Sequence, residues 1–108
     1  MPIYMYELSY TAESWAAQIK NPQDRVESIA RPACEAVGGK LIGGWYTFGD
    51  HDALFIAEMP DNESASALSL AVAAGGAVKS FKTTVLMTGE QAVAAMKKAP
   101  AIMYKPAR

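Results

Sequence analysis

The sequence predicts an α+β domain with the element order βαββαβ, in which an antiparallel sheet carries its helices on one face. Three observations lead to this prediction. Apolar and aromatic runs typical of strands occur at residues 3–10, 40–48, 53–59 and 78–87. Segments with helix-like apolar spacing separate the first strand from the second and the third from the fourth. A short polar segment at 49–52 joins the two middle strands as a hairpin.

The first half of the chain predicts a strand, a short helix and a longer kinked helix. Thr11 suits the N-cap of a short helical turn after the first strand. Asn21-Pro22 is a second helix start, because Asn suits the N-cap and Pro the first helical position. Pro32 lies inside the helix that follows and predicts a kink, and Gly38-Gly39 ends the helix. The apolar stripe of this helix comprises Val26, Ile29, Ala30, Ala33 and Val37.

The second half predicts the hairpin, a helix, the fourth strand and an extra C-terminal helix. Asp61 caps the helix at 62–74, and Gly75-Gly76 ends it. Thr88 and Gln91 form a capping box for the last helix. We expect one ferredoxin-like domain over residues 1–99 and an irregular tail over 100–108, an arm suited to lie on a partner.

Size, charge and cysteine content narrow the possible classes of protein. The chain has 108 residues, of which 51% are hydrophobic, and a domain of this length buries about 65% of its unfolded surface. The net charge is −1 without a Lys/Arg cluster, so no nucleic-acid partner is expected. Cys34 is the only cysteine, which excludes an internal disulfide. Because no membrane span or signal peptide is apparent, we expect no membrane association and a cytoplasmic location.

Both faces of the predicted sheet are apolar. If Phe48 opposes Asp52, Trp45 shares one face with Leu41, Ala53, Phe55 and Ala57. Tyr46 then shares the other face with Ile42, Phe48, Leu54 and Ile56. One helix layer covers only one face, and a bare apolar face of this size is unusual on a monomer. We therefore expect a homo-oligomer, at least a dimer, that buries the open face.

The chain's only histidine, His51, lies between Asp50 and Asp52 at the hairpin tip. A metal site is not expected, because neighbouring residues of a strand point to opposite faces and one histidine supplies too few ligands. Gly49-Asp50 is typical of a tight turn, which favours a structural role for the hairpin tip. In this interpretation the Asp52 carboxylate stabilises the hairpin. A ligand-gating role for His51 and Asp52 at the sheet edge is the alternative.

Two carboxylates, Glu7 and Glu58, interrupt otherwise apolar strands that are central neighbours in this fold. If both lie on the open face and approach each other, one of them has a raised pKa and can carry a proton. In the alternative interpretation, Lys40, Lys79 or Lys82 neutralises them, or they lie at a wet end of the sheet.

Aromatic residues of the predicted strands complete the candidate site. Such residues either line a pocket for a flat apolar molecule or fill a core or interface. No catalytic residue and no cofactor is predicted, and haem is disfavoured because the single histidine lies at a hairpin tip. The candidate ligand-binding residues are Glu7, Tyr6, Tyr46, His51, Asp52 and Glu58.

Several segments of the chain form a recognisable pattern. They are Gly38-Gly39-Lys40-Leu41, Tyr46 to Asp52, Glu58 to Asp61, the Asn21-Pro22 start with Arg25, and "VKSFKTTVLMTGEQ". Together these segments resemble the GYD domain family. The resemblance covers nearly the whole chain and implies a ferredoxin-like fold of the dimeric α+β barrel type, with little implication for function. His51 stands where the family's name-giving tyrosine is expected.

A second similarity concerns Gly49 to Asp52 before an apolar strand, with Asp61 opening the next helix. This pattern is similar to the effector-binding domain of leucine-responsive regulatory proteins, which shares the fold and forms oligomers. The chain has no room for their DNA-binding helices, so this resemblance implies at most a stand-alone ligand-binding module.

Three functions follow from the sequence. The leading one is an oligomeric protein that binds a small organic molecule between sheet and helices or between subunits. The second is a cofactor-free isomerase or monooxygenase, which rests on fold analogy and needs an apolar pocket with a convergent acid or base. The third is a structural or regulatory interaction protein, which predicts a filled barrel without a cavity.

Overall fold

The computed structural model describes residues 1–107 and confirms the predicted α+β, ferredoxin-like arrangement. The strands are β1 (Ile3–Tyr10), β2 (Lys40–Tyr46), β3 (Ala53–Glu58) and β4 (Val78–Leu86). The α-helices are α1 (Ala12–Lys20), α2 (Arg31–Ala36), α3 (Asn62–Gly75) and α4 (Gly89–Lys98). A π-helix (Val26–Ala30) precedes α2 and a 3-10 helix (Ala99–Ile102) follows α4.

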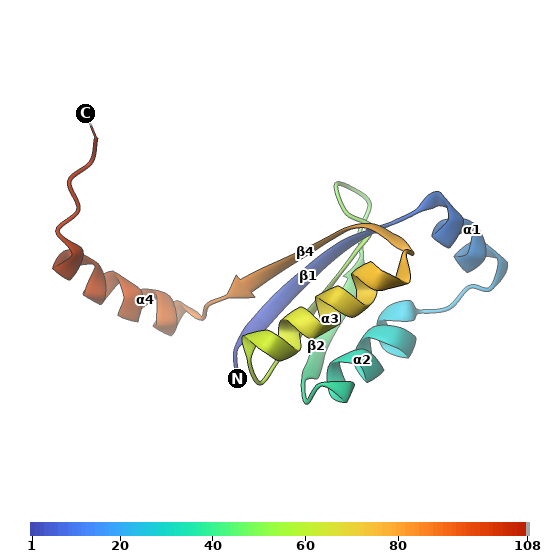
Figure 1. The fold of residues 1–108 in the computed structure, drawn as a ribbon, viewed down its shortest axis with the longest axis horizontal. Helices are drawn as coiled ribbons and strands as arrows, with labels where there is room; N and C mark the ends of the chain where they lie inside the picture. The colour runs from blue at the N-terminus through green and yellow to red at the C-terminus, as the bar shows by residue number, and fades with distance from the viewer. Residues whose placement is uncertain (108) are drawn as a thin grey trace.

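Within residues 1–107 the strands form one antiparallel sheet in the order β2-β3-β1-β4. The hairpin joins the neighbours β2 and β3, while helical segments connect β1 to β2 and β3 to β4. Helices α2 and α3 lie on the same side of this sheet (Figure 1). The sheet therefore has a helix-covered face and an open face.

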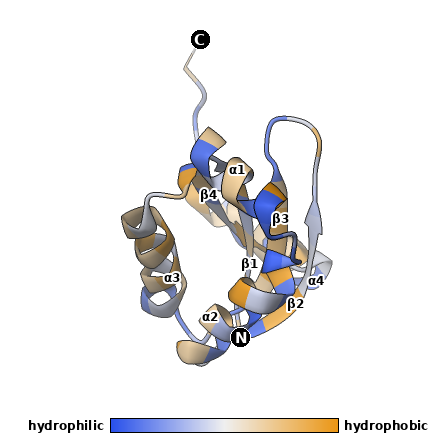
Figure 2. Ribbon diagram, turned by 90° about the vertical axis from the view of Figure 1, so that its right-hand side faces the viewer, coloured by the Kyte–Doolittle hydropathy of each residue, from blue (hydrophilic) through white to orange (hydrophobic). Residues whose placement is uncertain are grey.

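The core lies between the sheet and these helices. Every second residue of β1 points into it, as a half-buried strand requires, and the β1 residues that do so are Tyr4, Tyr6, Leu8 and Tyr10. The Tyr6 ring stacks on Phe55 at a centroid separation of 4.8 Å. Figure 2 shows strongly apolar segments, in orange, on the strands of the sheet.

The predicted register of β2 is wrong, because Thr47 and not Phe48 opposes Asp52 at the hairpin and because the strand also contains a β-bulge. The pairing shifts between Leu41, which opposes Ala57, and Gly43, which opposes Ile56, so that Ile42 is an extra residue. Beyond the bulge Trp45 opposes Leu54 and Tyr46 opposes Ala53. A shift of one residue moves every side chain to the other face, so Trp45 lies on the open face and Tyr46 on the helix-covered face.

The second predicted helix begins later than its sequence signals indicate. The Asn21 N–H donates to the carbonyl oxygens of Ala17 and Gln18, so Asn21 ends α1. Asp24 begins the next helix, because its carboxylate accepts from the Val26 N–H at 3.0 Å. Pro32 cannot donate a backbone hydrogen bond, and the predicted irregularity takes the form of the π-helix immediately before it.

The predicted caps of α1, α3 and α4 are confirmed. Thr11 accepts from the Ser14 N–H, and Asp61 accepts from the Ser64 N–H. Thr88 and Gln91 form the reciprocal capping box. Gly76, with φ of 74°, ends α3 in the left-handed conformation that glycine adopts readily.

The C-terminal arm, residues 89–107, extends away from the rest of the chain (Figure 1). The radius of gyration is 17.1 Å, whereas a compact chain of this length has one of roughly 13 Å. No residue of α4 is buried, and Met96 and Tyr104 expose 68% and 76% of their surface. In the described part of the chain, none of the helices has the length and apolar character needed to cross a bilayer.

Gly39→Ala is expected to lower the free energy of unfolding by about 1–3 kcal/mol, through overpacking. A Cβ at this position would lie 2.7 Å from the Glu58 carbonyl oxygen and 2.5 Å from Met59 Sδ. Urea denaturation followed by far-UV circular dichroism measures the change.

Gly75→Ala is the matched control, because a Cβ there meets nothing within 4 Å. It is expected to raise the unfolding free energy by about 0.5 kcal/mol. Equal effects of the two substitutions would contradict the close packing of β2, β3 and α2 at Gly39.

Candidate functional site

Asp52 anchors the hairpin to β1 and α1. Its carboxylate accepts from the Tyr10 backbone N–H at 2.8 Å and from Trp15 Nε1 at 3.2 Å. Its own backbone N–H donates to the Leu8 carbonyl oxygen. The hydroxyl of Thr47 donates to the His51 carbonyl oxygen across the turn. This geometry agrees with the structural interpretation of the hairpin, in which Asp52 stabilises the tip.

His51 lies on the open face, where its Nδ1 is 3.4 Å from the Glu7 carboxylate. Glu7 opposes Lys82 of β4 in the sheet register. Lys82 is thus the cross-strand neighbour of Glu7, but among residues 1–107 the ion partner within 4.0 Å of the Glu7 carboxylate is His51.

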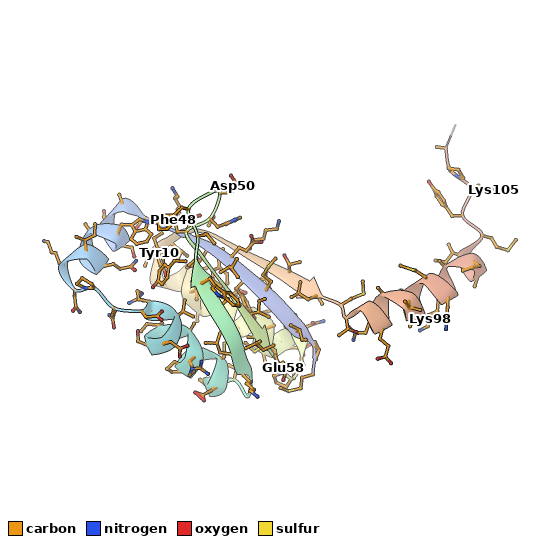
Figure 3. All side chains as sticks on the ribbon, turned by 180° about the vertical axis from the view of Figure 1, so that it is seen from behind. Tyr10, Phe48, Asp50, Glu58, Lys98 and Lys105 are labelled. Atoms are coloured by element: carbon orange, nitrogen blue, oxygen red, sulfur yellow. The ribbon has the colours of Figure 1, made fainter. Side chains whose placement is uncertain are left out.

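Glu7 and Glu58 share the open face but do not approach each other. Glu7 opposes Leu54, whereas Glu58 opposes Ile3, four residues away along β1. Four residues of a strand span about 13 Å. Figure 3 shows Glu58 at the end of the sheet opposite to Tyr10 and Asp50. Lys40 of β2 opposes Glu58, so within one subunit the structure offers a lysine neighbour to each carboxylate and no carboxylate pair.

Tyr6 belongs to the core. Its side chain is fully buried, and its hydroxyl donates to the Ala65 carbonyl oxygen at 3.1 Å. Burial, with smaller contributions from Cys34 and Tyr4, raises the pKa of Tyr6 to about 12. Burial likewise raises the pKa of the Cys34 thiol to about 11, which leaves it un-ionised at neutral pH.

A groove of about 410 Å³ lies between the π-helix and α2 on one side, α3 on the other, and the helix-covered face of the sheet. Its floor comes from the strands and includes Leu8, Ala53, Phe55, Val78 and Phe81. Its walls come from the helices and include Val26, Ile29, Ala30, Ala33, Leu68, Ala71 and Val72.

Small side chains on the facing helices create this space. Ala30 and Ala33 face the groove from one wall, and Ala71 and Gly75 from the other, where larger residues would fill it. The π-helix widens the turn that carries Val26 and Ile29, and such turns are frequent at functional sites. The groove is therefore a consequence of local sequence on both helical segments.

Polar groups gather at one end of the groove, around Tyr10 and Arg25, which are both lining residues. The Arg25 backbone N–H donates to the Tyr46 hydroxyl at 3.0 Å, and Asp52 holds the Tyr10 backbone. Burial raises the pKa of the Tyr10 hydroxyl, with a further rise from Tyr46, while the positive charge of Arg25 opposes the shift. Tyr10 is therefore a neutral hydrogen-bond donor at physiological pH.

The arrangement can hold a small molecule with an apolar body and one polar end. The described lining residues include no carboxylate and no imidazole, so the groove supplies no general base of either kind. Residues 1–107 contain no group of three or more His, Cys, Asp or Glu residues placed to hold a metal ion.

None of the six residues predicted to bind a ligand lines the groove, although two support its polar end. Tyr46 and Asp52 contact Arg25 and Tyr10, whereas Glu7, His51 and Glu58 lie on the open face and Tyr6 lies in the core. Sequence reasoning missed Tyr10 and Arg25. Two sequence features could have indicated them. Tyr10 is the last core-facing residue of the first predicted strand, and Arg25 directly precedes the apolar stripe of the helix that follows.

Comparisons with known proteins agree with this fold. Residues 4–96 match the family model described as GYD domain. Among solved structures the chain is similar to MtbAldR, with a TM-score of 0.60 and 13% sequence identity over 81% of this chain. The match covers 52% of MtbAldR, so the chain spans about half of that protein, and at this identity the likeness concerns the fold alone. No match was found among curated proteins.

Asp52→Ala is expected to lower the free energy of unfolding by about 1–3 kcal/mol, because two partly buried N–H donors lose their acceptor. Asp50→Ala is the control, since the Asp50 side chain is exposed, and it should change stability by less than about 0.5 kcal/mol. Urea denaturation of both variants provides the comparison. If Asp52→Ala is as stable as Asp50→Ala, the anchoring role of this carboxylate is wrong.

Proposed function

The chain belongs to the GYD domain family. We propose that it is a binding protein for a small organic molecule, with the groove between α2, α3 and the sheet as its site. The observation that carries this proposal is the groove itself, with an apolar lining and two polar side chains at one end. Its volume of about 410 Å³ falls within the roughly 300–1,000 Å³ of typical ligand pockets.

The observations favour binding over catalysis. An isomerase or monooxygenase of this fold needs an acid or base that converges on the substrate, and the groove lining offers Tyr10 and Arg25 only as donors. The groove also distinguishes this proposal from a purely structural role, which calls for a filled domain.

The functional unit of this proposal is a cytoplasmic homo-oligomer, at least a dimer, that buries the open face of the sheet. Ile3, Met5, Leu54, Ile56 and Leu86 share that face, as the strand register indicates. Trp45 lies beside them with 57% of its surface exposed. An apolar sheet face of this extent is typical of an interface rather than of a monomer surface.

The C-terminal arm supports the same assembly. Its apolar side chains, Val93, Met96, Ile102, Met103 and Tyr104, are all exposed in the single chain. An amphipathic helix that packs on nothing in its own subunit gains stability when a second copy covers its apolar side. In the proposed assembly, a second copy of the chain covers both the arm and the open face.

The groove predicts saturable binding of prodan, a neutral naphthalene fluorophore whose emission shifts to the blue in an apolar site. Ala33→Phe fills the groove and is expected to weaken prodan binding by about tenfold or more. Ala36→Phe, an exposed position on the same helix outside the lining, should change the affinity less than twofold. Equal binding by all three proteins would contradict the groove as the site.

The assembly predicts a molar mass of at least twice the 11.5 kDa of one chain, measured by multi-angle light scattering at micromolar concentration. Ile56→Lys on the open face should shift the mass toward the monomer, because a lysine buried in an apolar interface is costly. Leu70→Lys, at an exposed apolar position on α3, should leave the mass unchanged. A wild-type mass of 11.5 kDa would contradict the proposed oligomer.

A further inference from the structure

We propose that the ligand of the groove is an amphipathic carboxylate: a flat, apolar molecule that carries a single carboxylate, which Arg25 binds at the polar end. This inference rests on the proposed function and specifies the chemical class of its ligand. It is carried by three observations: the position of Arg25, the lack of a carboxylate partner for it, and the donor character of Tyr10.

Arg25 is a lining residue without a counter-charge in the described chain. The ion pairs within 4.0 Å among residues 1–107 are Arg31 with Glu27 and His51 with Glu7. A guanidinium beside an apolar groove presents a fork of donors that matches a carboxylate in two parallel hydrogen bonds.

Asp24, which precedes Arg25 in the chain, and Asp52, which holds the Tyr10 backbone, are engaged in other hydrogen bonds. Asp24 accepts from the backbone N–H groups of Val26 and Glu27 and thereby caps the π-helix. Asp52 accepts from the Tyr10 N–H and from Trp15 Nε1. No carboxylate of residues 1–107 thus pairs with the Arg25 guanidinium, which lies beside the Tyr10 hydroxyl and can bind an external anion together with it.

Two tyrosines, Tyr10 and Tyr46, complete the polar end of the groove around Arg25. The Tyr10 side chain is buried in the lining, and its neutral hydroxyl can donate to the same carboxylate. Tyr46 accepts from the Arg25 backbone N–H at 3.0 Å and so holds Arg25 in place at the start of the π-helix. Tyr46 therefore acts as a positioning residue, while Arg25 and Tyr10 contact the ligand.

The rest of the groove favours a flat hydrocarbon body. Phe55 and Phe81 form part of the floor, with ring centroids 6.5 Å apart, and present aromatic surfaces to the space above. The walls are aliphatic, with no charged side chain other than Arg25 in the lining. An aromatic or similarly flat carboxylate satisfies both the apolar floor and the cationic end.

Isothermal titration calorimetry with naphthoate and its neutral amide, naphthamide, tests the inference on the full-length protein at neutral pH. Naphthoate is expected to bind about tenfold more tightly than naphthamide, since a hydrogen-bonded charge pair contributes about that factor or more. Arg25→Gln should remove this preference by weakening naphthoate about tenfold and naphthamide less than twofold. Arg25→Lys, which keeps the charge but loses the fork, should give an intermediate affinity.

Arg31→Gln is the matched control, because Arg31 pairs with the exposed Glu27 and does not line the groove. It should leave both affinities within twofold of the wild type. Equal binding of naphthoate and naphthamide, or a preference that survives in Arg25→Gln, would overturn the inference while leaving a neutral ligand in the groove. If neither compound nor prodan binds, the proposed function fails and this inference fails with it.

Discussion

The close approach between Gly44 of β2 and Val26 of the π-helix determines how the two faces of the sheet are used. A Cβ at residue 44 would lie 2.3 Å from Val26 Cγ1, so the helix can approach the strand this closely only at glycine. The bulge at Ile42 brings Gly44 to this position. It also turns Trp45 to the open face and Tyr46 toward the helices, where the Tyr46 hydroxyl holds the backbone of Arg25.

The two faces consequently have different roles in the proposed function. The helix-covered face carries the groove, whose polar end depends on Arg25 and Tyr10 and on the support that Tyr46 and Asp52 give them. The open face carries apolar side chains together with Glu7, His51 and Glu58, and it faces a second copy in the proposed assembly. The acid–histidine–acid tip contributes to architecture, because the Asp52 carboxylate is used in holding β1 and α1.

The fold could be predicted from the sequence because its signals are local. Strand alternation, the caps at Thr11, Asp61 and Thr88, and the hairpin between two apolar runs each depend on a few neighbouring residues. The register of β2 could not be predicted, because the sequence does not specify which residue of β2 opposes Asp52 at the hairpin. The bulge also lacks a strong sequence signal, since Gly43-Gly44 is compatible with a bulge but does not require one.

The candidate site was harder to predict for a related reason. The sequence left open whether Glu7 and Glu58 share a face and how far apart they lie, because both depend on strand register, which the alternating pattern does not contain. The groove depends on alanines from two segments about 40 residues apart, Ala33 and Ala71 among them, and an alanine in a helix ordinarily indicates nothing beyond helix propensity. Tyr46 and Asp52 were predicted to bind a ligand because they are polar groups next to apolar strands. In the structure they instead hold Tyr10 and Arg25 through hydrogen bonds.

In the proposed function, an apolar molecule with an anionic end occupies the groove between α2 and α3. The most direct measurement is a crystal structure of the protein grown with naphthoate. We expect density for the rings above Phe55 and Phe81, with the carboxylate within about 3 Å of the Arg25 guanidinium. Density for the ligand on the open face or between subunits, with the groove filled by water alone, would contradict it.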